Sequence, residues 1–110
     1  MPTLTQAQID AFDRDGAITV ENAVTPEQLA AMCAVFARWV EESRAHDAPY
    51  GEMIDGRPRF DVDPDHSDDH PSLRRIGSPT ELEDIFLEVL TDSPMIRMLQ
   101  DLLGPDLRLH

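Results

Sequence analysis

The sequence contains no lysine, so arginine supplies all nine of its permanently cationic side chains. These nine face 22 aspartate and glutamate residues, and the formal net charge at pH 7 is −13. An acidic surface repels both the phosphate backbone of nucleic acids and the headgroups of anionic membranes. We therefore expect neither nucleic acid nor a membrane among the partners of this protein.

Cysteine and long apolar runs are also scarce. Cys33 is the only cysteine, which excludes an internal disulfide, and the apolar helical pattern around it predicts a thiol buried in the core. No apolar run approaches the ~18 residues of a membrane span, and the polar N-terminus has no signal-peptide core. We therefore expect a cytoplasmic protein with one small domain, residues 1–110.

The first helix is predicted by a capping box. Thr5 is followed three residues later by Gln8, a spacing at which each side chain can bond to the backbone N–H group of the other residue. The predicted helix covers residues 5–15 and ends at Gly16, because glycine tolerates the left-handed conformation that commonly closes a helix. Residues 17–21 then alternate weakly between apolar and polar, which predicts a short strand.

A second capping box, formed by Thr25 and Gln28, starts a longer helix that we expect to reach about Arg44. Apolar residues at steps of three and four predict that one stripe of this helix faces the core. The stripe consists of Leu29, Met32, Cys33, Phe36 and Val40. Trp39 lies off the stripe, so we expect it to cover an edge of the core.

Two further helices are predicted in the C-terminal third of the chain. Each begins with a serine followed by proline, at Ser78 and at Ser93, and Glu81 completes a capping box at the first of them. Gly104 and the proline after it end the last helix. The apolar stripes contain Leu82, Ile85, Phe86, Val89 and Leu90 in the first helix, and Met95, Met98, Leu99, Leu102 and Leu103 in the second.

Residues 45–77 lack periodicity and are rich in aspartate, proline, glycine and histidine. A stretch this long exceeds the ~12–15 residues of an ordinary structureless loop, so it predicts either a functional lid or disorder. Only residues 73–76 suggest a short extended piece. We therefore predict an α+β fold made of a mostly helical shell with one or two short strands, which is too little for a stable sheet.

One short motif in this acidic loop suggests metal chemistry. His66 and Asp68 form an H-x-D triplet, and His110 could supply a third ligand. Two histidines and a carboxylate on one face of a metal are the ligand set of non-haem iron oxygenases. The triplet is short and its loop is crowded with aspartate, so a solvated acidic loop is the interpretation that we favour.

The arginines of the same region offer a second kind of site. Arg57, Arg59, Arg74 and Arg75 could pair with the aspartates nearby, which is the commoner role, or hold an anionic substrate. Arg74 and Arg75, together with His110, are the candidates for a substrate pocket. The sequence has no phosphate-binding glycine loop and no nucleophile elbow, so the residues alone show no complete catalytic site.

The order of these pieces resembles a known family. Residues 4–32, LTQAQIDAFDRDGAITVENAVTPEQLAAM, resemble the N-terminus of the phytanoyl-CoA dioxygenase family. Residues 59–110 resemble its bacterial members, most recognisably in the run LLGPDLRLH. The resemblance implies a double-stranded β-helix, or jelly roll, with helices packed outside it. It also implies Fe(II) and 2-oxoglutarate as cofactors and the hydroxylation of a small-molecule substrate.

In that family the H-x-D motif, the distant histidine and the arginine that grips 2-oxoglutarate all follow the LLGPD run. The resemblance therefore carries no metal role onto His66 or Asp68, and it places His110 on the strand that leads toward the active site. It implies that this chain is the N-terminal part of the domain, that neither cofactor binds it alone and that it is inactive by itself. The alternative is a non-catalytic, mostly helical module that binds other proteins.

Overall fold

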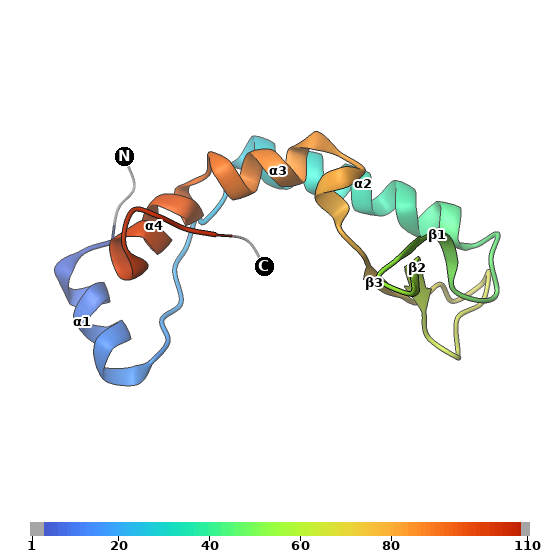
Figure 1. Cartoon of the computed structure of the whole chain (residues 1–110), viewed down its shortest axis with the longest axis horizontal. Helices are drawn as coiled ribbons and strands as arrows, with labels where there is room; N and C mark the ends of the chain where they lie inside the picture. The colour runs from blue at the N-terminus through green and yellow to red at the C-terminus, as the bar shows by residue number, and fades with distance from the viewer. Residues whose placement is uncertain (1–3, 109–110) are drawn as a thin grey trace. The chain divides into compact units, whose positions relative to one another are not determined.

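The computed structural model describes residues 4–108 as an α+β fold with four α-helices, one 3₁₀ turn and one three-stranded antiparallel sheet (Figure 1). The predicted α+β class is confirmed, but the prediction of one or two short strands, too few for a stable sheet, is wrong, because three strands pair. The chain divides into two compact units, of which residues 1–29 and 87–110 form the first and residues 30–86 form the second. Each unit has its own packing.

Helix α1 (Gln6–Asp15) begins and ends as predicted. The Thr5 hydroxyl accepts a hydrogen bond from the Gln8 backbone N–H at 3.2 Å, and the Gln8 side-chain oxygen accepts one from the Thr5 N–H at 2.8 Å. At the other end, Gly16 has a left-handed φ of 79°, and its N–H donates to the Phe12 carbonyl at 2.8 Å. Both capping signals in the sequence are therefore used.

The strand predicted for residues 17–21 is wrong. The segment is coil, because it finds no strand within residues 4–108 to pair with, and an isolated strand is unstable. The alternation behind the prediction is still visible in the burial of the side chains. Ile18 and Val20 are half-buried, whereas Ala17 and Thr19 are exposed.

Helix α2 (Pro26–Ser43) starts at the predicted capping box, in which Thr25 and Gln28 exchange hydrogen bonds of 3.0 and 3.1 Å. Helix α4 (Pro94–Leu103) also has the predicted bounds. α2 is 18 residues long, and charged side chains interrupt its outer surface. Across residues 4–108, none of the helices combines the length and the apolar character needed to cross a bilayer.

The third predicted helix begins differently. Ser78 has a φ of 48° and its side chain makes no capping hydrogen bond, and the residues after it form the 3₁₀ turn η1 (Pro79–Glu81). Helix α3 (Asp84–Thr91) starts only after this turn. The predicted capping box is therefore wrong here, because an N-cap needs the extended backbone conformation that Ser78 lacks.

The segment predicted to be a long loop, residues 45–77, contains the sheet of the second unit. In order, and antiparallel to one another, the strands are β1 (Tyr50–Ile54), β2 (Arg57–Val62) and β3 (Leu73–Ile76). Asp55 and Gly56 connect the first two strands with φ angles of 52° and 80°, as in two-residue hairpin turns. The prediction of an unstructured stretch is therefore wrong, whereas the extended piece at 73–76 is confirmed.

The packing of the second unit centres on Trp39, which is only 5% exposed. Its ring lies edge-on to Phe60 at 6.0 Å and stacks on Phe86 at 5.5 Å, measured between ring centroids. Val35 and Val62 are also buried. Trp39 was expected at the edge of the core, but it lies at the centre, because aromatic side chains on β2 and α3 give its large ring the more extensive contact.

Candidate functional site

His66, the histidine of the H-x-D triplet, has both ring nitrogens occupied. Its Nδ1 accepts a hydrogen bond from the Ser72 backbone N–H at 2.8 Å, so the proton lies on Nε2, which donates to the Ser43 carbonyl at 2.9 Å. The side chain is buried and ties the loop after β2 to the end of α2. Neither nitrogen has a lone pair free for a metal in this arrangement.

The other residues of the motif are not brought to His66. Asp68 and His70 are exposed, and the Asp68 backbone carbonyl accepts a hydrogen bond from Arg44. Within residues 4–108, no group of three or more histidine, cysteine, aspartate or glutamate side chains is placed to hold a metal ion. His110, the third candidate ligand, lies outside the described residues. The triplet therefore serves the structure of its loop through His66.

Arg59 is buried, and both of its Nη groups are engaged. It donates to the carbonyls of Gly77 and Ser78 at 2.8 and 3.1 Å, and to the carboxylates of Glu52 and Glu81 at 2.9 Å each. The hydrogen bond to Glu52, and after it the one to Glu81, raises the pKa of Arg59. Arg59 therefore fixes the end of the sheet to η1 and is not free to bind a substrate.

Arg74 and Arg75, the predicted pocket residues, have different surroundings. Nε of Arg74 lies 3.3 Å from the Asp61 carboxylate, and Nη1 lies 4.0 Å from the Asp63 carboxylate. Arg75 lies opposite Asp61 in the β2–β3 register, but the Asp61 carboxylate forms its ion pair with Arg74. Arg75 has no ion pair with any residue that the structure describes, so of the two only Arg75 is available to a ligand.

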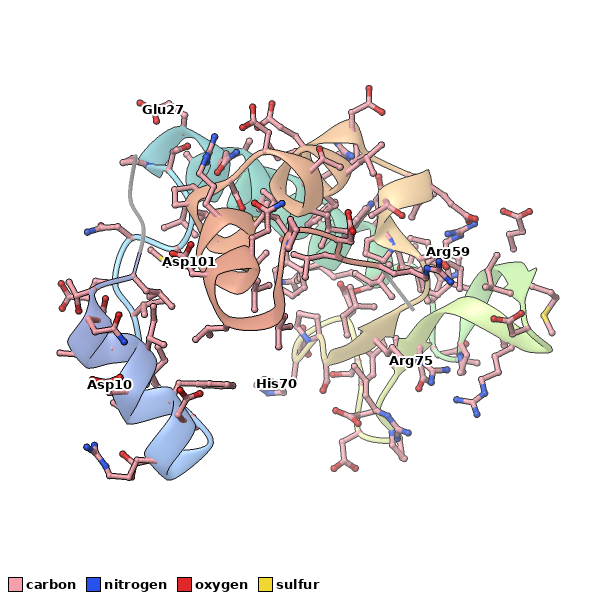
Figure 2. The ribbon with its side chains drawn as sticks, turned by 60° about the vertical axis from the view of Figure 1, so that its left-hand side comes forward. Asp10, Glu27, Arg59, His70, Arg75 and Asp101 are labelled. Atoms are coloured by element: carbon pink, nitrogen blue, oxygen red, sulfur yellow. The ribbon has the colours of Figure 1, made fainter. Side chains whose placement is uncertain are left out.

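Arg75 shares a polar groove of about 380 Å³ with Arg57, and Asp55 and Ser78 also line it. Figure 2 shows Arg75 on the same sheet as the buried Arg59. Among residues 4–108, neither Arg57 nor Arg75 pairs with a carboxylate and the Ser78 hydroxyl has no hydrogen-bond partner, although acidic side chains outnumber arginines 22 to nine. Two free guanidinium groups beside a hydroxyl can bind a small oxyanion.

Sequence reasoning counted Arg57 among four arginines that could hold an anion, but it named only Arg74 and Arg75 for the substrate pocket. A signal for Arg57 was present, because the Asp55–Gly56 pair is a strong hairpin signal and Arg57 follows it directly. Recognition of that hairpin would have predicted that Arg57 begins a strand near the extended piece that carries Arg75.

The outer stripe of α2 is the second notable surface. Leu29 is 52% exposed, Phe36 is 49% exposed and Cys33 is exposed too. The sequence predicts that the whole stripe faces the core and that the Cys33 thiol is buried. The thiol is exposed, and of the stripe only Met32 and Val40 are half-buried, because α2 turns its Trp39 face to the sheet instead. Beside the stripe, Phe36 and Phe86 are among the residues that line an almost wholly apolar groove of about 400 Å³.

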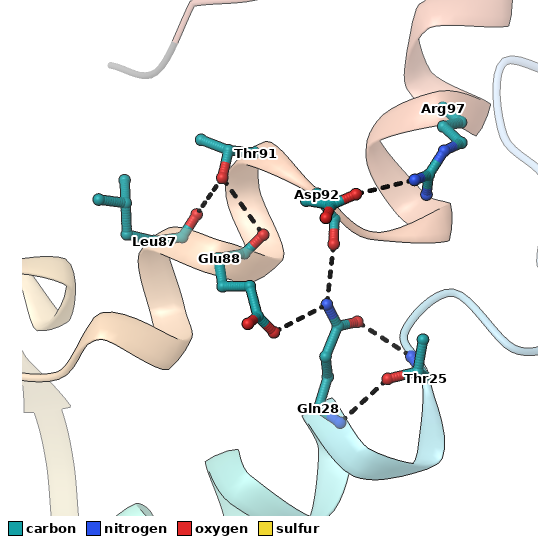
Figure 3. Close-up of polar contacts among 7 residues, drawn as sticks. All are labelled: Thr25, Gln28, Leu87, Glu88, Thr91, Asp92 and Arg97. Atoms are coloured by element: carbon teal, nitrogen blue, oxygen red, sulfur yellow. Dashed lines mark hydrogen bonds and ion pairs between the residues drawn. The ribbon is translucent and has the colours of Figure 1, made fainter.

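A polar cluster in the first unit joins α2 to the end of α3 (Figure 3). The Gln28 side-chain nitrogen donates to the Glu88 carboxylate at 3.1 Å and to the Asp92 carbonyl at 2.8 Å, while its oxygen accepts from the Thr25 N–H. Arg97 pairs with the Asp92 carboxylate at 2.8 Å. The polar groups of the cluster satisfy one another, so we assign it to stability and not to binding.

Comparison with known proteins adds no family to this picture. No family model matches the chain, and neither a curated protein nor a solved structure matches it. The functional proposal therefore depends on the chain itself.

Proposed function

We propose that this chain is the N-terminal shell of a jelly-roll dioxygenase that uses Fe(II) and 2-oxoglutarate to hydroxylate a small molecule. Two kinds of observation support the proposal. One is the resemblance of residues 4–32 and 59–110 to the phytanoyl-CoA dioxygenase family. The other is the surface that the folded chain leaves uncovered.

The exposed stripe of α2 carries the proposal. One side of α2 is buried through Val35 and Trp39, and the adjoining side presents Leu29, Cys33 and Phe36 to solvent. Burial of a leucine or phenylalanine side chain contributes about 1.5–3 kcal/mol each, so the stripe is a costly surface to leave bare. An apolar patch of this kind marks a packing partner, and a jelly-roll sheet beneath an outer helix is such a partner.

Leu107 agrees with this interpretation. The alternation of Leu107 and Leu109 with polar neighbours predicts that a strand begins there. Within the described residues, Leu107 is 36% exposed and belongs to no strand. In a self-contained helical module we would expect it to be buried against the helices. Its exposure therefore favours the shell over the module.

The described residues do not fit an iron ion. Both nitrogens of His66 are hydrogen-bonded to backbone groups. Among residues 4–108, Asp68 belongs to no group of side chains that could hold a metal ion. We therefore assign no step at iron to these residues and propose that the metal ligands lie elsewhere in the domain.

The groove of Arg57 and Arg75 fits an anionic group of the substrate. The resemblance places the arginine that grips 2-oxoglutarate after the LLGPD run, so the groove is not assigned to that cofactor. A guanidinium group binds a carboxylate through two parallel hydrogen bonds, and Ser78 can donate another. 2-Oxoglutarate, held elsewhere in the domain, would supply two electrons by losing CO₂ and becoming succinate. The part of this chain is to hold and orient the anionic group of the substrate. Because both arginines are exposed, this interaction alone is weak.

The proposal is tested first on the gene. The reading frame after residue 110 should continue into an H-x-D triplet followed by a more distant histidine. A frame that stops without them would contradict the proposal.

A second test is kinetic. In the longer polypeptide, Arg75→Ala should raise the KM for an anionic substrate roughly tenfold with little change in kcat, because a charge-assisted contact to the bound substrate is lost. Arg74→Ala is the matched control, since that guanidinium is already paired with Asp61. An equal KM in the two variants would remove the groove from the proposal.

The second candidate is the helical interaction module, because the same stripe of α2 would serve as a docking face. The two functions differ in one measurement. The module forms no succinate from 2-oxoglutarate in any polypeptide that contains it, whereas the shell does so once the rest of the domain is present.

A further inference from the structure

We propose that the groove of Arg57 and Arg75 binds the zwitterionic head of a free amino acid. The two guanidinium groups hold its carboxylate, and Asp55 holds its ammonium group. This inference rests on the proposed function, because it names the class of substrate to which the anionic group belongs. The groove has a volume of about 380 Å³, and charged residues of both signs line it.

Asp55 is the negatively charged residue of the groove. It lies in the turn between β1 and β2, where its φ is 52°, and it precedes Arg57 by two residues. Among residues 4–108, the Asp55 carboxylate forms neither an ion pair nor a side-chain hydrogen bond, although Arg57 and Arg75 line the same groove. Opposite charges that share a groove without pairing are complementary to a ligand that carries both signs.

The side of the groove at Gly77 and Ser78 is fixed by Arg59, which is only 4% exposed. Nη1 of Arg59 donates to the carbonyls of Gly77 and Ser78 at 2.8 and 3.1 Å, and the Gly77 N–H donates to the Arg59 carbonyl at 2.8 Å. These three bonds hold Ser78 in the groove lining before a ligand binds. A site that is fixed in advance loses less conformational entropy on binding.

The charge of the whole protein favours a zwitterion over a simple anion. A formal net charge of −13 repels a ligand that is only anionic, whereas a zwitterion is neutral and is not repelled. Ile54 and Pro58, both half-buried, form the apolar part of the groove lining. An amino acid with an apolar side chain therefore matches the groove best.

The probe is L-leucine, titrated into the chain of 110 residues and followed by the NMR shifts of the Arg57, Arg75 and Ser78 amides. Two controls keep the carbon skeleton and remove one charge each. Isocaproate lacks the ammonium group, and isoamylamine lacks the carboxylate. L-Leucine should bind about fivefold more tightly than either control, because each control loses an exposed ion pair.

Asp55→Asn tests the contact to the ammonium group. Asparagine tolerates the left-handed backbone of the turn, so the variant removes the charge and keeps the hairpin. It should weaken binding of L-leucine about fivefold and should not weaken binding of isocaproate, which has no group for Asp55. Asp47→Asn is the matched control, because Asp47 is exposed and lies outside the groove lining. It should leave both affinities unchanged.

Arg75→Gln tests the contact to the carboxylate. It should weaken binding of both L-leucine and isocaproate, because both ligands carry that group. Arg74→Gln is its control, since the Arg74 guanidinium is already paired with Asp61, and it should leave both affinities unchanged.

Three results would overturn the inference. They are equal affinities for L-leucine and isocaproate, equal losses of the two ligands in Asp55→Asn, and equal losses of L-leucine in Arg74→Gln and Arg75→Gln. The titration contains neither iron nor 2-oxoglutarate. Its failure therefore leaves the formation of succinate by the longer polypeptide to be judged separately, and an absence of succinate leaves the result of the titration unchanged.

Discussion

At the scale of a single residue, Tyr50 is packed between two other rings of the second unit. Its ring stacks on His46 at 3.6 Å and on Phe60 at 4.8 Å, and its hydroxyl is buried without a hydrogen-bond partner among residues 4–108. Burial, and after it the charge of Glu42, raises the pKa of Tyr50. The folded state therefore favours the neutral phenol.

The first prediction concerns the titration of Tyr50. It is the only tyrosine, so phenolate absorbance reports it alone, and the midpoint should lie above the ordinary value of about 10. Stability gained from a raised tyrosine pKa is present below the unfolded pKa and lost as the pH rises through the folded one, so the second unit should loosen in alkali. Glu42→Gln should lower the midpoint only in part, because burial is the larger cause. A midpoint equal to that of the chain in denaturant would contradict this account.

His66 gives the second prediction. Removal of its ring in His66→Ala leaves the Ser43 carbonyl and the Ser72 N–H without their partner, which should lower the free energy of unfolding by about 1–3 kcal/mol. His70→Ala is the control, since His70 is exposed, and should stay within about 0.5 kcal/mol. Urea denaturation measures both. If the chain instead lost tight Fe(II) binding in His66→Ala, the structural role given to His66 would be wrong.

At the scale of elements, the two capping boxes differ in their surroundings. The box of Thr5 and Gln8 is exposed, whereas Gln28 is buried and also bonds to Glu88 and Asp92. We predict that Gln28→Ala lowers the free energy of unfolding of the first unit by about 1–3 kcal/mol. Gln8→Ala should lower it by at most about 1 kcal/mol. Thermal unfolding of the two variants makes the comparison, and an equal loss would show that the contacts of Gln28 to α3 contribute nothing.

Helix α2 provides the fourth prediction. Phe36→Ser should lower the free energy of unfolding of the isolated chain by at most about 1.5 kcal/mol, because about half of the Phe36 surface is exposed. Trp39→Ala should lower it by about 3–5 kcal/mol, because Trp39 is in the core. Binding of a hydrophobic dye should fall in Phe36→Ser. If Phe36→Ser were as damaging as Trp39→Ala, the stripe would already be covered in the isolated chain.

Local signals predicted where helices α1 and α2 begin and where α1 ends. Thr5, Gly16 and Thr25 act through hydrogen bonds to residues three or four positions away, so their effect does not depend on the rest of the fold. At α4 this holds only for the C-terminal end, where the Gly104 N–H donates to the Gln100 carbonyl at 2.9 Å, because the predicted Ser93 cap makes no side-chain hydrogen bond. Ser78 shows the limit of this reasoning, because its left-handed backbone, which no local rule announced, prevents the capping bond.

The sequence did not predict which face of each helix is buried, because that depends on long-range packing. The stripe of Leu29 and Phe36 has the spacing of a core face, and only the contacts of Trp39 with Phe60 and Phe86 show that a different face is buried. Strands β1 and β2 were missed because the Asp55–Gly56 hairpin that joins them was not recognised, whereas β3 was expected as an extended piece. Of the two groove arginines, only Arg75 was therefore predicted as a pocket residue, since the groove exists only when β2 and β3 lie side by side.

At the scale of the whole molecule, the described residues leave three surfaces without a partner. They are the stripe of α2, the groove of Arg57 and Arg75, and the unpaired backbone of residues 17–20. The first unit holds residues 17–20, and the second holds the groove and most of the stripe. The stripe is the observation on which our proposal of a larger domain depends.

The formation of succinate tests this account most directly. It should be measured with Fe(II), 2-oxoglutarate and oxygen on the chain of 110 residues and on the longer polypeptide read from the same frame. We predict succinate from the longer polypeptide alone. Succinate formed by the 110-residue chain itself, or none formed by a longer polypeptide that carries the H-x-D triplet and the distant histidine, would contradict the account.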